Sequence, residues 1–499
     1  MGQNVSKNSL LANILQSIGA GIFTSAAGFF SSIIVARTLG VHGTASIAIA
    51  LWIVFFATTI FDLGLAATQS RFIPEAQESE SPELAQSIEA LVFRRFLWAI
   101  IAGCIVLGLA YVSYWRDRLD QYTGGVVEPV SFYSLIVVCF IIHMTYAFAY
   151  NKLRARREFS RIALLCLSGM LLQIICVLGL SLAFGGVGAL AGYIVGSVPL
   201  ASVLVRNYHM TGSPSPEVRT RVTRYANSLW LASLLSPLIW SRADLFLVGL
   251  YIDSKALGVF AAAATLAALL LQLCQMICNG LLPNLVRLTA KQAHDTLQDV
   301  SRLTVGILLL ALYPICFGIS ALAPILIALL YGKEFADASG VAVLLGLAAA
   351  ASSTTIVCSN VLNLVEKNTS LILSGIVGAV LTIVVTIWAL PRFGFNGAAT
   401  ARIVSQAAVA AITLFQLRMH LPGSVSWSTL LAKLIASALC FCAATYFVDP
   451  CAPVRSLVLA IIAGAATYVP IVTALLAISP SGRQEISFLR RWFKTHHSV

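Results

Sequence analysis

Long apolar segments dominate this sequence and constrain its fold more than any other feature. Fourteen of them alternate with short segments that hold most of the charged residues. A helix needs about 20 consecutive apolar residues to cross a bilayer, and inside hydrocarbon a helix satisfies all of its own backbone groups. The sequence therefore predicts an all-α polytopic membrane protein with about 14 transmembrane helices. The predicted spans are 10–36, 44–68, 91–114, 130–151, 162–183, 187–205, 225–251, 256–282, 303–330, 338–364, 368–390, 395–417, 428–448 and 454–478.

The composition excludes a water-soluble enzyme of the ordinary type. Of 499 residues, 59% are hydrophobic and only 10% are charged, whereas about a quarter of a typical soluble domain is charged. No polar block is long enough for a large soluble domain. The net charge of +12 fits the basic cytoplasmic loops of a membrane protein, so we expect no nucleic-acid partner.

The distribution of basic residues predicts the orientation. If the N-terminus is cytoplasmic and span ends are counted with the adjoining segments, 23 Lys and Arg residues fall on the inside, 7 fall on the outside, and Arg242 and Arg402 lie deeper within spans. Basic residues are enriched in cytoplasmic loops, so both termini are expected in the cytoplasm.

Two internal echoes predict a duplicated architecture. Leu39-Gly40-Val41 recurs as Leu257-Gly258-Val259, and the segments 185–196 and 394–405 share five of twelve residues. We expect two six-helix bundles of the same orientation, related by a pseudo-two-fold axis along the membrane normal, plus two C-terminal helices. The predicted parts are an N-terminal bundle at 1–206, a cytoplasmic linker at 207–224, a C-terminal bundle at 225–420, two additional helices at 421–480 and a basic amphipathic tail at 481–499 that would anchor at the membrane surface.

Few ionisable residues lie inside the predicted spans, which makes each a candidate for function. Arg242 and Asp244 lie in the seventh span and Arg402 in the twelfth, and for these three both cavity lining and structural anchoring stay open. Asp62 could cap a helix or bind the inner loop, or act as a coupling group. His143 is a candidate proton relay, because the unperturbed pKa of histidine is about 6.5, but a packing role is the competing interpretation.

Several motifs are missing. The sequence has no GxxxxGK[ST] loop, no HExxH and no paired Cys/His spacing for a metal. We therefore expect no metal, no cofactor and no enzymatic activity, with proton or sodium coupling left open.

Several segments carry a resemblance to a known family. They are Val35 to Gly43, Phe61-Asp62-Leu63-Gly64-Leu65, Arg71 to Glu75, Asp244 to Gly249, Leu329 to Phe335 and Gly394 to Ala399. In this order they resemble bacterial polysaccharide-biosynthesis transporters, the lipid-linked oligosaccharide flippases of the multidrug/oligosaccharidyl-lipid/polysaccharide exporter superfamily. Thr44 stands where the family usually has an aromatic residue.

The resemblance implies a function and a set of site residues. Two bundles would rock between inward-open and outward-open states and flip an undecaprenyl-diphosphate-linked oligosaccharide across the bacterial inner membrane. Arg242 and Arg402 would be substrate-binding cations in the cavity, with Arg37 and Arg71 at the ends of the N-terminal half. The partners would be the lipid bilayer, the polyprenyl-diphosphate-linked substrate, and the polysaccharide polymerase with its chain-length machinery.

Three other functions compete with this one. A multidrug or small-cation antiporter of the same superfamily would need more intramembrane acids than Asp62 and Asp244. A membrane enzyme that modifies or polymerises glycans would need a larger outer loop or a reactive pocket. A membrane scaffold without transport is compatible with the same sequence.

Overall fold

The chain is almost entirely helical. A computed structural model describes residues 7–78, 82–206, 212, 214–233, 243–291, 297–364, 368–449 and 453–496, and within these ranges it contains helices and short turns but no strand. The predicted all-α class is confirmed. The chain divides into two compact units, residues 1–261 and 262–499, and each is described by itself.

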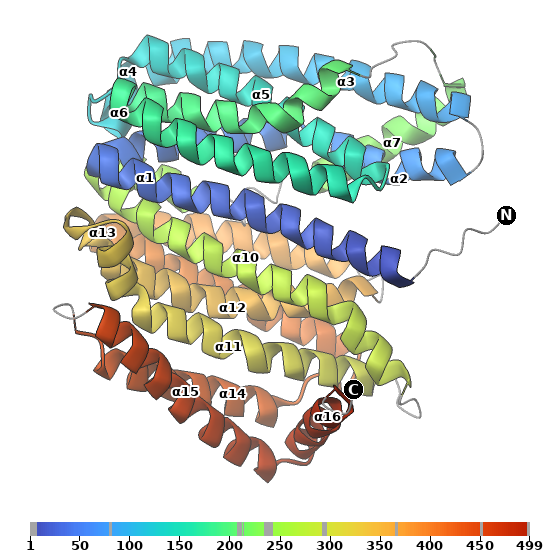
Figure 1. Cartoon of the computed structure of the whole chain (residues 1–499), viewed down its shortest axis with the longest axis vertical. Helices are drawn as coiled ribbons and strands as arrows, with labels where there is room; N and C mark the ends of the chain where they lie inside the picture. Colours follow the sequence, from blue (N-terminus) through green and yellow to red (C-terminus); the bar gives the residue numbers. More distant parts are fainter. Residues whose placement is uncertain are drawn as a thin grey trace. The chain divides into compact units, whose positions relative to one another are not determined.

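The first unit holds the helices up to the beginning of α10 (Figure 1). They are α1 (Lys7–Phe61), α2 (Leu65–Glu78), α3 (Pro82–Ala110), a π-helical turn (Tyr111–Trp115), α4 (Arg116–Thr123), α5 (Pro129–Ala155), α6 (Phe159–Arg206), α7 (Pro216–Ser233), α9 (Ala243–Tyr251) and α10 (Ser254–Lys291), which continues into the second unit. Residues 116–123, which lie between the predicted spans 91–114 and 130–151, are helical, and Gly124 ends that helix in the left-handed conformation.

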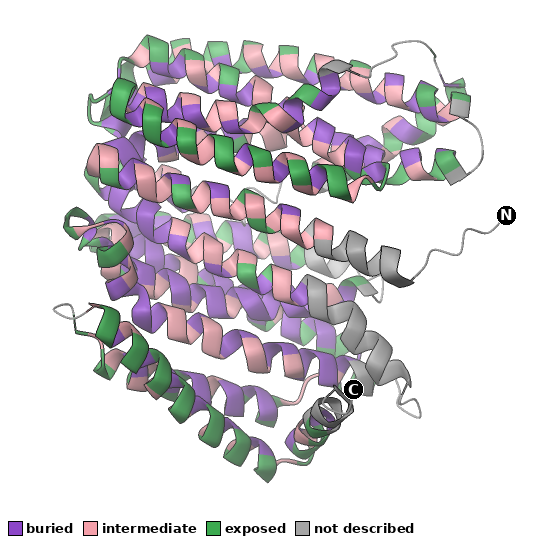
Figure 2. Cartoon of the chain, in the orientation of Figure 1, coloured by how far each residue is buried: buried purple, intermediate pink, exposed green. Residues whose placement is uncertain are grey.

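The second unit contains the remaining helices. They are α11 (Leu297–Leu330), a 3-10 turn (Lys333–Phe335), α12 (Ala338–Leu364), α13 (Asn368–His420), α14 (Trp427–Tyr446), α15 (Pro453–Ile478) and α16 (Pro480–His496). Figure 2 shows α12 as largely buried, whereas the outer side of α15 is exposed. The exposed side chains of α15 include Val454, Val458, Ile461 and Ile462, which is the surface expected of a helix that faces lipid.

One glycine in each of three long helices has a positive φ. Gly40 in α1, Gly185 in α6 and Gly394 in α13 have φ of 67°, 59° and 59°. A Cβ makes this conformation costly, so glycine is the residue that permits a sharp bend there. Each of the three lies between two predicted spans. The long helices are therefore pairs of spans joined at a glycine.

This explains the number of helices that can cross a membrane. Within the described part of the chain, ten helical stretches are long and apolar enough to do so, and three of them hold two predicted spans each. Together they cover most of each of thirteen of the fourteen predicted spans. The remaining one, 225–251, includes residues 234–242, which lie outside the described ranges. The second span, predicted as 44–68, is too long, because α1 ends at Phe61 and a turn leads into α2.

The second internal echo corresponds to a shared local structure. A Cβ added at Gly188 would overlap the carbonyl oxygen of Leu180, and one at Gly397 would overlap that of Ala389, eight residues earlier in both cases. In the first echo the backbones differ. Gly40 is a bend, whereas Gly258 lies within α10, where a Cβ would overlap the carbonyl oxygen of Val41. The two-fold relation between the halves and the predicted domain boundaries stay predictions.

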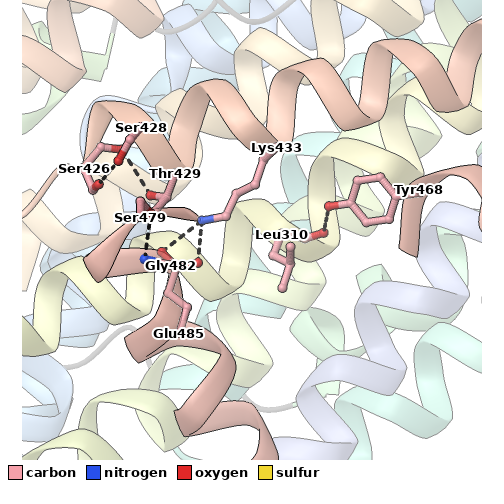
Figure 3. A network of polar contacts seen from close by, with 9 residues as sticks. All are labelled: Leu310, Ser426, Ser428, Thr429, Lys433, Tyr468, Ser479, Gly482 and Glu485. Carbon is pink, nitrogen blue, oxygen red and sulfur yellow. Dashed lines mark hydrogen bonds and ion pairs between the residues drawn. The ribbon is translucent and has the colours of Figure 1, made fainter. Parts of the chain in front are cut away.

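A buried ion pair fastens the C-terminal helix to the second unit. Lys433 Nζ of α14 lies 3.1 Å from Oε1 and 2.8 Å from Oε2 of Glu485 in α16, and both side chains are almost fully buried (Figure 3). Gly306 of α11 makes space for the Glu485 carboxylate, because a Cβ at this position would overlap it. Phe488 is buried in the same unit. This side of the tail, predicted to anchor at the membrane surface, packs against the protein itself.

We predict that Lys433→Met loosens α16, because it leaves the Glu485 carboxylate buried without its partner. Removal of one member of a buried pair costs about 3–5 kcal/mol, whereas replacement of both by apolar residues is often neutral. Trypsin should therefore cleave Lys433→Met faster at Arg483 and Arg490, and the double variant with Glu485→Leu should regain most of the protection. Arg302→Gln is the control, since Arg302 bonds Gln484 of α16 at the exposed surface. Equal cleavage of the control and Lys433→Met would contradict the prediction.

Candidate functional site

The structure places the predicted cavity residues in different surroundings. Arg242 lies outside the described residues. Arg402 is half-buried in α13, eight residues after the bend at Gly394. Asp244 is buried in the first turn of α9, where its Oδ1 accepts a hydrogen bond from the Leu245 amide at 3.0 Å. Because Arg402 and Asp244 belong to different units, their roles in one cavity stay predictions.

Two other predicted residues lie on helices of the first unit. Arg37 is exposed on α1, three residues before the bend at Gly40. His143 is half-buried on α5, where the edge of its ring meets Phe55 at 4.9 Å and the ring stacks on Tyr146 at 5.8 Å. These aromatic neighbours are what a packing role requires, and the proton-relay role is untested.

The junction between α1 and α2 is a tight turn that meets α7. Leu63 has a φ of 48° and Gly64 a φ of 74°, so two consecutive residues are left-handed. For Leu63 this conformation stores strain, which the surrounding contacts must hold. A Cβ at Gly64 would overlap the carbonyl oxygen of Ala226 in α7. Asp62 caps α2, since its Oδ1 accepts from the Ala66 amide at 3.4 Å and its carbonyl from Leu65 at 2.8 Å.

Arg95 of α3 donates hydrogen bonds both to the turn between α1 and α2 and to α7. Its Nη2 donates to the Leu63 carbonyl at 3.1 Å and to Oδ1 of Asn227 in α7 at 2.7 Å. Trp230 Nε1, one turn further along α7, donates to the Ile60 carbonyl at 2.7 Å. We refer to the contacts of Gly64, Arg95 and Trp230 with their partners as the α7 seam. Sequence reasoning missed Arg95, because nothing in the sequence separates it from its neighbour Arg94. Both count only among the basic residues of the cytoplasmic side.

Arginine and aromatic side chains continue the contact between α2 and α7. Phe72 of α2 meets Tyr225 of α7 edge-on at 5.3 Å, and the Arg71 guanidinium lies 4.6 Å from the centre of the Tyr225 ring. Arg221 Nη2 pairs with Glu75 Oε1 at 2.9 Å. The predicted cation Arg71 is thus exposed. It shares a neighbour with Arg221 of α7, since their guanidinium groups lie 5.6 and 5.4 Å from the centre of the Phe72 ring.

An open groove of about 670 Å³ runs along this side of α7, from Pro216 to Ser228. Its lining residues are Pro216, Glu217, Thr220, Arg221, Arg224, Tyr225 and Ser228, so two arginines face one acid. Arg71 lies next to the groove through its contact with Tyr225. We refer to this surface as the arginine groove. Guanidinium groups donate planar, paired hydrogen bonds that match phosphate oxygens, so the surface is chemically suited to an anion.

The helix after residues 234–242 is held to the first unit by aromatic rings. Phe246 of α9 stacks on Trp52 of α1 at 4.6 Å and on Tyr122 of α4 at 5.9 Å. At the beginning of α10, Ser254 Oγ lies 2.8 Å from Nδ1 of His42 in α1. Both described parts of the seventh predicted span, α7 and α9, are therefore fastened to α1–α4. This explains why the first compact unit extends to residue 261.

The fold and the exposed apolar helix surfaces define a polytopic membrane protein. The chain belongs to the polysaccharide biosynthesis protein family, whose pattern matches residues 10–289. The predicted family is confirmed. No curated protein matches the chain significantly.

Solved structures share the fold over most of the chain. The lipid II flippase MurJ in an inward closed conformation has a TM-score of 0.73 and 14% identity, and the match covers 93% of this chain and 99% of that one. An inward-facing multidrug resistance transporter of the MATE family, in the MOP superfamily, has a TM-score of 0.61 and 15% identity, with coverage of 82% and 98%. At these identities the similarity establishes the fold.

We predict that Arg95→Ala and Asn227→Ala are energetically coupled, because one guanidinium holds both the turn and α7. Hydrogen bonds to a charged group contribute about 1.5–3 kcal/mol. Thermal unfolding of the purified single and double variants should give a coupling energy of about 1 kcal/mol, within the range for residues in contact. Arg94→Ala is the control, since Arg94 bonds the Gly212 carbonyl at the exposed surface and should be additive with Asn227→Ala. Additivity of Arg95→Ala with Asn227→Ala would show that the seam does not hold α7.

Proposed function

We propose that this protein flips polyprenyl-diphosphate-linked oligosaccharide repeat units across the bacterial inner membrane, for surface or exopolysaccharide biosynthesis. The observation that carries the proposal is membership of the polysaccharide biosynthesis family, whose pattern matches more than half of the chain. The transporter fold supports it, and one solved structure with that fold is a flippase for lipid II by its name.

The chemistry of the cargo requires a particular path. A glycan with a diphosphate cannot enter hydrocarbon, because its charged and polar groups would lose their hydrogen bonds to water. The path must supply water or polar groups for the sugars and cations for the phosphates. We assign the cavity cations to Arg242 and Arg402, with Arg37 and Arg71 at its ends. Asp62 and Asp244 have structural or coupling roles in this proposal.

The proposal includes transport without catalysis. The sequence has no nucleotide-binding loop, so a secondary mechanism would be driven by protons, by sodium or by removal of the flipped sugar. With the positive-inside distribution, both termini and the α2–α7 contact lie on the cytoplasmic side. The polymerase and the chain-length machinery would take the product on the far side.

We predict that the chain restores surface glycan to a bacterial strain that lacks its repeat-unit flippase. At matched membrane expression, Arg242→Ala and Arg402→Ala should each reduce the surface glycan about tenfold or more, since each removes a charge-assisted contact with phosphate. Arg392→Ala is the control for Arg402→Ala. Arg392 lies on the same helix but is exposed, with its guanidinium over the Trp388 ring.

Three outcomes separate the alternatives. Loss in the two cavity variants but not in Arg392→Ala supports flipping and the assigned cations. Full activity of all four proteins keeps the function and overturns the site. Drug resistance conferred on the strain, without surface glycan from any of several tested repeat units, would favour the antiporter.

A further inference from the structure

The arginine groove is lined by two arginines and one acid, Glu217, and the exposed Arg71 adds a third positive charge next to it, so its net charge suits a diphosphate. Arg221 and Arg224 are one turn apart on α7 and line the groove, and Arg71 approaches from α2. All three guanidinium groups belong to exposed residues, so a ligand can reach them. Two adjacent phosphates offer enough oxygens for several arginines at once, which one carboxylate does not.

The aromatic rings orient Arg71 for this task. The guanidinium of Arg71 lies over Tyr225 at 4.6 Å, and Tyr225 is held edge-on by Phe72. A guanidinium attracted to the face of a ring still has N–H donors that can bind an oxyanion. The buried Phe72 fixes the ring pair, and thereby the position of the arginine, against α2.

Glu75 occupies part of the site in the present structure. Its carboxylate pairs with Arg221 at 2.9 Å, and both side chains are about half exposed. An ion pair this exposed is weak, because water screens it and two flexible side chains must be ordered. A diphosphate carries more charge than a carboxylate and can replace Glu75 as the partner of Arg221.

We propose that the arginine groove binds the diphosphate group of the lipid-linked substrate before it is flipped, and that this binding displaces Glu75 from Arg221. The inference rests on the proposed function for the identity of the lipid. The shared chemistry is that of a diphosphate anion, which either a polyprenyl diphosphate headgroup or free pyrophosphate could supply. The α7 seam lies next to the groove, at Ala226 and Asn227, so bound substrate would contact the helix that leads to Arg242.

The test measures binding of inorganic pyrophosphate to the purified full-length protein by calorimetry. Arg221→Gln should weaken binding about tenfold, the value of one charge-assisted contact. Glu75→Gln should tighten it several-fold, because the competing carboxylate is gone. This gain of affinity is not produced by a misfolded variant. Arg219→Gln is the matched control, since Arg219 is an exposed arginine on the same helix that does not line the groove.

A second arm identifies the source of the anion. Undecaprenyl diphosphate in nanodiscs should compete with pyrophosphate for the wild-type protein, which assigns the groove to the lipid headgroup. Pyrophosphate binding without competition would assign the groove to a free anion and overturn the substrate role. Equal losses of pyrophosphate affinity in Arg219→Gln and Arg221→Gln would show that the anion is attracted by the general positive charge of α7 and not by the groove. An unchanged affinity in Glu75→Gln would contradict the displacement of Glu75. If pyrophosphate does not bind while the chain still restores surface glycan, the groove is wrong and the proposed function stands.

Discussion

Backbone amides and carbonyls inside hydrocarbon must find their partners within the chain, and this constraint determines most of the structure. Because there is no water to bind them, the chain must be helical wherever it crosses the membrane. Where the chain turns back between two spans, the connection must then use few residues. At Gly40, Gly185 and Gly394 one left-handed glycine is enough to separate two predicted spans in what is otherwise continuous helix. The same constraint makes polar groups scarce, so the few contacts between them, such as Lys433 with Glu485, have a large effect on how helices dock.

The sequence predicts the elements well and their docking poorly, for a physical reason. Because hydrophobicity follows the order of residues, the spans can be located from the sequence. The repeated segments 185–196 and 394–405 each begin at a bend glycine, but the bends themselves are seen only in the structure. The docking of α7 depends instead on single groups brought together by the fold. Nothing in the sequence distinguishes Arg95 from Arg94, or shows that Gly64 must be small because the Ala226 carbonyl lies against it. Similarly, Glu485 in the basic tail is the side chain that turns inward, although an amphipathic pattern alone suggests a helix on the membrane surface.

In the candidate site, too, the sequence identifies single residues, whereas the contacts between them are seen only in the fold. Arg71 can be identified from the sequence because it begins a family-like segment, but Tyr225, whose ring its guanidinium lies over, is about 150 residues away and meets it only in the fold. The α7 seam and the aromatic stack around Phe246 hold the two described parts of the seventh predicted span against the first four helices. The proposed function requires two alternating states, and such contacts would have to break in one of them. Exposed ion pairs and partly exposed hydrogen bonds are suited to this, because water replaces them at little cost.

The most direct test of the proposed flipping is reconstitution of the purified protein in vesicles that contain a fluorescent undecaprenyl-diphosphate-linked oligosaccharide. A reagent that cannot cross the membrane would modify only the lipid in the outer leaflet. We predict that vesicles with the protein expose nearly all of the labelled lipid to the reagent over time. If about half of the label stays protected, as is expected of two equal leaflets in protein-free vesicles, while a known flippase exposes it under the same conditions, the protein does not flip this lipid.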